Sequence, residues 1–195
     1  MPVVTALRER SRSRVEIELD GGSWRLVPAD AVVRAGLRVG AQLDREKARA
    51  LGRELRRAKA LGVATTALRY RDHSRRSLEE RLAGRGVAPA AGAAAIAALE
   101  QAGLVDDGRV AAARAETLAS RGYGDAAIRF DLERRGIAPE LVEAALAGLD
   151  PEPERARAAV ARNGGGPATA RRLASRGFDP GVIEDVLGSP FAADG

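Results

Sequence analysis

The first regular alternation of hydrophobic and polar positions along the chain lies in residues 15–28. Residues 15–20 alternate apolar and acidic side chains, which is the period of a strand with one buried face. Residues 20–22, Asp-Gly-Gly, tolerate a positive φ, and residues 24–28 alternate again. The pattern predicts a β-hairpin, which needs a cover because two strands alone are marginal in water. Candidates for that cover are Val32, Val33, Leu37, Val39 and Leu43.

The pattern changes after Asp44, which is expected to be the N-cap of a helix. Leu51, Leu55 and Ala58 follow at helical spacing in a charged, alanine-rich segment, and Gly62 is expected to end this helix. From there to the C-terminus the pattern predicts short helices separated by Gly and Pro. The basic residues before the hairpin, 1–14, are predicted to be disordered.

One motif occurs three times in the rest of the chain. Leu-x-x-Arg-Gly, followed by an apolar residue, a spacer and a proline, stands at residues 82–89, 132–139 and 173–180. The glycines are 50 and 41 residues apart. Periods of this size are typical of arrays of small helical units, none of which can bury its apolar face alone.

Each position of the motif has a physical role. The leucine is the last core residue of a helix, the glycine takes the left-handed conformation that ends it, and the proline starts the next helix. A further helix precedes each copy, at about 61–71, 107–120 and 154–163. The predicted fold is mainly α: three tandem three-helix repeats in an elongated, curved array, preceded by a small N-terminal β-hairpin module. The predicted parts are a disordered N-terminus (1–14), the hairpin module (15–43), a linking helix (44–60), the repeats (61–105, 106–150 and 151–190) and a tail (191–195).

Composition excludes several kinds of site. The 195 residues contain no cysteine and one histidine, which argues against disulfides and zinc sites. No stretch approaches ~20 consecutive apolar residues, and the N-terminus lacks the apolar block of a secretory signal, so a cytoplasmic protein is expected. Residues 1–81 hold 19 Lys and Arg against 11 Asp and Glu, whereas residues 82–195 hold 13 against 16. This asymmetry suggests a basic end that meets a polyanion or an acidic protein surface.

Four segments contain residue types found in catalytic or phosphate-binding sites, but none of them is interpreted as such a site. Asp72-His73-Ser74 are consecutive, so their side chains cannot converge as a catalytic triad. Asp106-Asp107 precede a helix, where a carboxylate caps free N–H groups. The glycine clusters at 122–124 and 164–166 follow no strand and lack the Gly-Lys-Ser/Thr ending of a phosphate loop. We therefore assign no catalytic residue, metal ligand or cofactor, and expect a binding protein.

Arginines recur around the three copies of the motif. On stacked units they would form a stripe along one side, and guanidinium groups suit carboxylates and phosphates alike. The alternative is a solvated helix surface that neighbouring glutamates partly neutralise. The candidate partner-binding residues are Arg69, Tyr70, Arg71, Arg75, Arg76, Arg81, Arg121, Arg129, Arg134, Arg135, Arg171, Arg172 and Arg176.

Several short motifs stand in a fixed order along the chain, and each is weak alone. They are Leu68-Arg-Tyr-Arg-Asp-His-Ser74 with Leu78 and Leu82, Asp106-Asp-Gly-Arg-Val-Ala111, Arg121-Gly-Tyr-Gly124 with Ile128, Leu132 and Gly136, and Arg176-Gly-Phe178. Together they resemble the RecX family, bacterial regulators of the RecA recombinase, over about residues 44–190. The sequence departs from the family in three places. Ser77 stands where a Glu usually completes a capping box, and Val110 replaces a commoner aromatic residue. The third unit has Asn163-Gly-Gly-Gly166 and Thr169, so its second helix is expected to be short or frayed.

The resemblance implies a partner and a function. Such a protein would lie along the groove of a RecA filament on single-stranded DNA, inhibit ATP turnover and strand exchange, and favour disassembly of the filament. The expected partners are the RecA filament and, through basic patches, single- or double-stranded DNA; no membrane partner is expected, and the protein is expected to be a monomer. The alternative is a helical module that binds nucleic acid directly, without RecA. The acidic half of the chain and its few aromatic residues for base stacking speak against that alternative.

Overall fold

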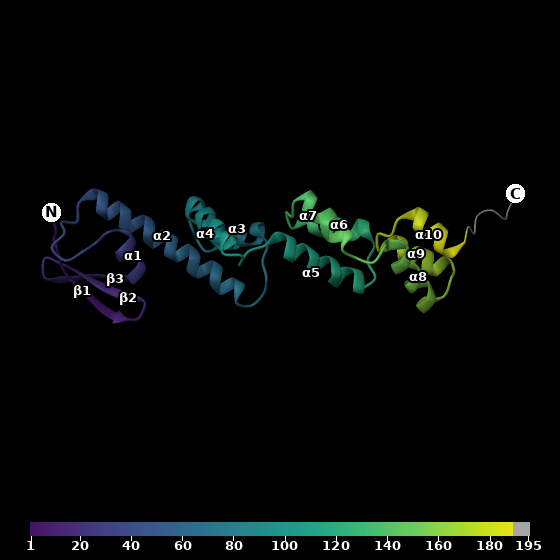
Figure 1. Ribbon diagram of the computed structural model, residues 1–195, viewed down its shortest axis with the longest axis horizontal. Coiled ribbons are helices and arrows are strands. Elements are labelled where there is room, and N and C mark those ends of the chain that lie inside the picture. Colours follow the sequence, from purple (N-terminus) through teal and green to yellow (C-terminus); the bar gives the residue numbers. More distant parts are fainter. Residues whose placement is uncertain (189–195) are drawn as a thin grey trace. The chain divides into compact units, whose positions relative to one another are not determined.

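The computed structural model describes residues 1–188 and divides into two compact units. The first contains residues 1–71 and 78–104, and the second contains residues 72–77 and the chain from Val105 onward. The described part is mainly helical, with one small sheet near the N-terminus (Figure 1), as the sequence predicts. The predicted tail, 191–195, lies outside the described residues.

An antiparallel sheet of three strands opens the first unit, in the order β1-β2-β3. The predicted hairpin consists of β2 (Arg14–Leu19) and β3 (Gly22–Pro28). At its turn, Asp20 and Gly21 have φ angles of 49° and 84°. This pair of positive values is what a two-residue hairpin turn requires.

The prediction that residues 1–14 are disordered is wrong, because residues 4–11 form β1 (Val4–Ser11). β1 pairs with β2 along its length, and its Val4 is completely buried. Its arginines have partners on the neighbouring strand, where Arg8 pairs with Glu18 and Arg10 with Glu16. What looks in the sequence like a basic arm is therefore a strand whose charges are matched across the sheet.

One face of the sheet is covered by α1 (Ala29–Arg34) and the first half of α2 (Arg45–Leu68). Ile17 of the sheet and Leu51 of α2 are buried in one core with Val32, Leu37 and Leu43. Three of the five predicted cover residues are thus in this core. The other two, Val33 and Val39, are exposed by 77% and 59%.

Helix α2 continues through Gly62 to Leu68, so the prediction that Gly62 ends a helix is wrong. The predicted linking helix and the predicted first helix of repeat 1 are one element. A glycine in a helix interior costs about 1 kcal/mol. The second half of α2 offsets this cost because it packs against α4 (Pro89–Gln101) and buries Ala60, Ala64 and Ala67. Between these two helices in sequence lies α3 (Arg75–Gly84).

The second unit contains two groups of three helices. The first group is α5 (Asp107–Ser120), α6 (Asp125–Arg134) and α7 (Pro139–Ala147), packed around a core that includes Ile128 and Val142. The second group is α8 (Glu152–Asn163), α9 (Pro167–Ser175) and α10 (Pro180–Leu187), packed around Phe178 and Ile183.

The Leu-x-x-Arg-Gly motif, which occurs three times, ends a helix in each copy, and the roles predicted for its leucine, glycine and proline are confirmed. Gly86, Gly136 and Gly177 have φ angles of 64°, 74° and 78°. In each copy the amide of the following apolar residue donates to the carbonyl of the motif leucine, over 3.1–3.2 Å. This is the Schellman arrangement, in which a left-handed glycine satisfies the last carbonyls of a helix. The motif prolines are the first residues of α4, α7 and α10.

The predicted acidic caps are also present. Asp44 accepts a hydrogen bond from the amide of Lys47 over 2.7 Å, and Asp106 accepts one from the amide of Arg109 over 2.9 Å. Asp107 accepts from the amide of Arg75 over 2.8 Å and so caps the start of α3. Within residues 1–188 no helix is both long and apolar enough to cross a membrane.

Candidate partner-binding site

The predicted binding residues fall into groups with different surroundings. Six are exposed, line neither of the two pockets described below, and make no side-chain hydrogen bond or ion pair within residues 1–188; among them is Tyr70, whose exposure is 84%. The six are Arg69, Tyr70, Arg71, Arg81, Arg134 and Arg171. The other seven make contacts inside the second unit or line a pocket there.

Two of the predicted arginines are neutralised by carboxylates. Nε of Arg129 is 2.9 Å from Glu143, and Nε of Arg135 is 2.7 Å from Asp131. Asp131 also accepts two hydrogen bonds from Arg114, over 2.9 and 3.0 Å. The bonds from Arg114 and Arg135 lower the pKa of the Asp131 carboxyl to about 2. The bond from Arg129 likewise lowers the pKa of Glu143. These guanidinium groups already hold partners within the fold.

Arg75 and Arg76 begin α3, in the short segment 72–77 that is part of the second unit. The aliphatic part of Arg76 lies against Gly136, where an added Cβ would be 3.1 Å from the Cβ of Arg76. Ser74, just before this turn, points its hydroxyl at the carbonyl of Arg135 over 3.5 Å. Arg76 therefore covers the end of α6, a role that the sequence pattern did not suggest.

Three predicted residues, Arg121, Arg172 and Arg176, come together in one pocket of about 250 Å³. The pocket lies in the second unit, between the end of α5 and helices α8 and α9. A fourth arginine, Arg162, also lines it, and no Asp or Glu does. We call these four residues the arginine pocket. Four positive charges without a counter-charge in the lining favour a bound anion.

Two side chains of the arginine pocket are held in place from within the fold. The guanidinium of Arg176 lies 4.9 Å from the ring centre of Tyr123 and donates to the carbonyl of Arg121. Arg172 donates to the side chain of Asn163 over 2.8 Å. Because each guanidinium has five N–H donors, both keep donors for a ligand. Because these two side chains are already held in place, binding a ligand would cost less side-chain conformational entropy.

The side chains of Arg121 and Arg162 make no hydrogen bond or ion pair with any residue of 1–188. Arg162 was not among the predicted residues, because it lies outside the repeated motif. Its position in the last turn of α8, just before Gly164, is the signal that could have identified it. Arg121 is the C-cap residue of α5, directly before Gly122.

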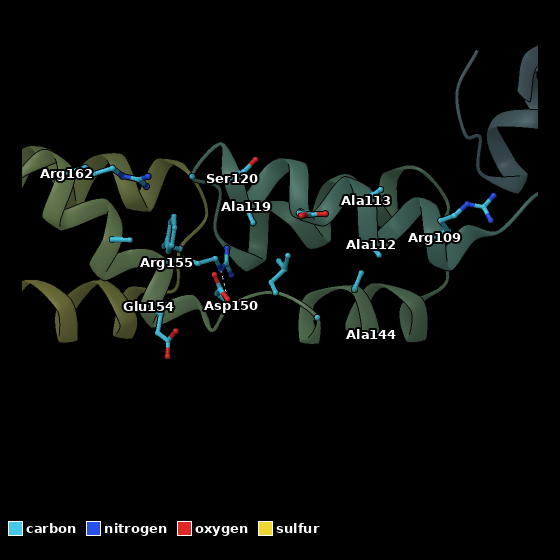
Figure 2. A pocket seen from close by; sticks show the side chains of 17 residues that line it. Arg109, Ala112, Ala113, Ala119, Ser120, Ala144, Asp150, Glu154, Arg155 and Arg162 are labelled. Atoms are coloured by element: carbon cyan, nitrogen blue, oxygen red, sulfur yellow. Dashed lines mark hydrogen bonds between the residues drawn. The ribbon is translucent and has the colours of Figure 1, made fainter. Parts of the chain in front are cut away.

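A groove of about 910 Å³ adjoins the arginine pocket and shares Ser120, Gly122 and Arg162 with it. Helices α5, α7 and α8 supply most of its lining, in which six alanines stand beside three arginines and the carboxylates Glu116, Asp150 and Glu154 (Figure 2). Arg109 and Arg162 lie at opposite ends of the row of labelled residues in this view (Figure 2). Small side chains leave room for an extended segment or a helix, and the arginines offer contacts for acidic groups on it.

The wall of the groove near Phe178 is fixed by Arg155. This side chain donates to the carbonyls of Asp150 and Tyr123, over 2.9 Å each, and to the carboxylate of Asp125. Its guanidinium also lies 5.9 Å from the ring centre of Phe178. Arg155 therefore joins the two helix groups of the second unit. In residues 1–188 no cluster of three or more His, Cys, Asp or Glu is placed to hold a metal ion.

Comparison with known proteins identifies the family of this chain. Residues 106–146 match the family model described as RecX, second three-helix domain. The regulatory protein RecX of Xanthomonas citri is 36% identical over 150 residues, which are 72% of this chain and 93% of the relative. A solved structure titled "Crystal structure of regulatory protein RecX" superposes with a TM-score of 0.82 at 22% identity, over 95% of this chain and 98% of that one. RecX from Lactobacillus salivarius gives a TM-score of 0.60 at 19% identity, over 68% of this chain and 94% of that one. The chain belongs to the RecX family of regulatory proteins.

Proposed function

We propose that this protein regulates the RecA recombinase by binding its filament on single-stranded DNA. In this proposal it inhibits ATP turnover and strand exchange and favours disassembly of the filament. Membership of the RecX family supports the choice of partner. A cytoplasmic location, which the sequence analysis expects, is part of the same proposal.

The observation that carries the proposal is the arginine pocket beside the groove between α5, α7 and α8. The pocket presents Arg121, Arg162, Arg172 and Arg176 without a carboxylate in its lining. The groove next to it is large enough for a peptide segment. A segment of the filament that carries Asp or Glu would place its chain along the groove and its carboxylates in the pocket. Arg–carboxylate pairs of this kind are short and can be bidentate.

The test is inhibition of the DNA-dependent ATPase of RecA by a double variant, Arg121→Gln with Arg162→Gln. Neither side chain has a partner within residues 1–188, so the substitution removes no internal contact of the described part. Loss of two charge-assisted contacts is expected to raise the concentration for half-maximal inhibition by about tenfold or more.

The matched control is Arg85→Gln with Arg157→Gln, which removes the same charge from two exposed positions outside the pocket. It is expected to inhibit within about twofold of the parent protein, since it leaves every proposed contact in place. Circular dichroism checks that all variants keep their helicity. Undiminished inhibition by the pocket variant would rule out the arginine pocket as the RecA contact.

A further inference from the structure

The positive charge of this protein is concentrated in one helix. Helix α2 contains seven Lys and Arg residues and two Glu, an excess of five. The whole chain has a net charge of +5, so the rest of the chain is neutral overall. A basic surface that binds a polyanion is therefore expected on α2, which belongs to the first unit, whereas the arginine pocket belongs to the second.

Four arginines of α2 lie on one side of the helix, at Arg45, Arg49, Arg53 and Arg56. With 3.6 residues per turn they fall within a sector of about 80°, along about 16 Å of helix. We call them the α2 stripe. Leu51 and Leu55 lie on the opposite side, where they join the core of the sheet. The glutamates of the helix, Glu46 and Glu54, fall outside the sector.

The side of α2 that carries the stripe is exposed in the first half of the helix and buried in the second half. In the second half of α2 this sector holds Ala60 and Ala67, which are buried where the helix packs against α4. In the first half all four arginines of the stripe are exposed. On this side of α2, arginine therefore stands where the helix is exposed, and alanine stands where the helix packs against α4.

The stripe differs from most arginine clusters of this fold because its charges are not neutralised. None of its four guanidinium groups forms an ion pair or a side-chain hydrogen bond with residues 1–188. By contrast, Arg8, Arg114 and Arg129 each bind a carboxylate. Exposed basic side chains without internal partners are free to bind an external anion.

The surface of α2 between these four arginines forms a shallow groove. A shallow groove of about 590 Å³ is lined by the four arginines together with Ala48 and Gly52. A Cβ on Gly52 would lie 3.5 Å from a terminal nitrogen of Arg56, so the guanidinium of Arg56 sits over the glycine. Small residues at the floor let a chain approach the helix closely, and no aromatic or large apolar side chain of α2 interrupts the stripe.

We propose that the α2 stripe binds the phosphodiester backbone of a nucleic acid, independently of RecA. Guanidinium forks at regular intervals along a straight helix match the regular phosphates of a strand. A folded protein partner is less suited, since protein interfaces are centred on buried aromatic or apolar anchors, and this groove has none. Without aromatic residues to stack on bases, the contact would be independent of base sequence.

The test measures binding of labelled single-stranded and duplex DNA by fluorescence anisotropy, without RecA, over a range of salt concentrations. The variants are Arg49→Gln with Arg53→Gln, the charge-conserving pair Arg49→Lys with Arg53→Lys, and the same control, Arg85→Gln with Arg157→Gln. Loss of two phosphate contacts is expected to reduce the slope of log K against log salt by about 1.4 for single strands and about 1.8 for duplex. The Lys pair should keep most of the slope, and comparison of the two probes identifies the preferred form of DNA.

Two results would overturn the proposal. If the Gln stripe variant and the control change DNA binding alike, only net charge matters and the stripe is not a site. If the stripe variant binds DNA like the parent but co-sediments less with RecA filaments, the stripe contacts an acidic protein surface instead. The RecA proposal is tested separately, because the pocket variant Arg121→Gln with Arg162→Gln is expected to keep its DNA binding.

Discussion

The backbones of Gly124 and Gly177 lie directly against each other in the second unit. The amide of Gly124 donates to the carbonyl of Arg176 over 2.9 Å, and a Cβ added to Gly124 would overlap the carbonyl group of Gly177. Gly177 is equally enclosed, since its own Cβ would come within 2.7 Å of the Cβ of Ala127. Gly177 thus ends α9 with its positive φ. Because it has no side chain, the start of α6 can pack directly against its backbone.

Gly124→Ala is expected to destabilise the second unit, because the new methyl group has no space. Overpacking against backbone that cannot move away should cost about 3 kcal/mol. The control is Gly166→Ala, the N-cap of α9, where a Cβ meets nothing within 4 Å. Both variants replace an N-cap glycine, so the difference between their urea midpoints isolates the close contact. Equal midpoints would show that the two helix groups separate at little cost.

Asp131 is expected to make the second unit sensitive to acid. Its folded pKa of about 2 is below its ordinary value of 3.8, so the unfolded chain takes up the proton first as pH falls. The stabilisation is therefore complete above about pH 5 and is lost as pH falls through 3.8 towards 2. Asp131→Asn should cost about 2 kcal/mol at pH 7 and almost nothing at pH 2, as measured by urea unfolding at both values.

The comparison variant for Asp131 is Glu143→Gln. Its ion pair with Arg129 is largely exposed, with 61% exposure at the glutamate side chain. An exposed pair of this kind contributes little, so the urea midpoint at pH 7 is expected to stay close to that of the parent protein. A loss as large as that of Asp131→Asn would mean that burial of the carboxylate does not set the strength of these pairs.

Arg155→Lys is expected to loosen the joint between the helix groups of the second unit although it keeps the charge. The guanidinium bonds to Asp125 and to two backbone carbonyls at once, and its side chain is only 11% exposed. A lysine cannot reach all three acceptors, so we expect a loss of about 2–3 kcal/mol. Hydrogen exchange of the α8 amides measures it, with the exposed Arg157→Lys as control. Equal protection in both variants would contradict this role of Arg155.

Leu51→Ala is expected to destabilise the first unit by about 3 kcal/mol, because Leu51 is only 2% exposed in the core that α2 shares with the sheet. Hydrogen exchange should rise in β1–β3 and in the first half of α2, while α5–α10 stay protected. Val33→Ala, at a position that is 77% exposed, should change stability by less than ~0.5 kcal/mol. Unchanged protection of the strands in Leu51→Ala would show that the sheet folds without α2.

The sequence alone determined the features that depend on a few consecutive residues. The Leu-x-x-Arg-Gly motif predicted where helices end, because a Schellman structure is formed by six adjacent residues, as in 82–87. The hairpin turn and the caps Asp44 and Asp106 were predictable for the same reason. Family membership followed from the order of such local motifs.

Only the tertiary structure decided what depends on residues far apart in the chain. Arg129 is neutralised by a glutamate 14 residues away, whereas Arg176 keeps donors in a pocket with Arg162. Residues 4–11 form a strand because another strand offers backbone partners and matching charges. Helix α2 passes through Gly62 because α4 buries the alanines around it. In each case the stabilising contacts come from a residue or element far away in the chain, which the local sequence does not specify. The sequence pattern therefore showed where arginines recur, but not which of them remain free to bind a partner.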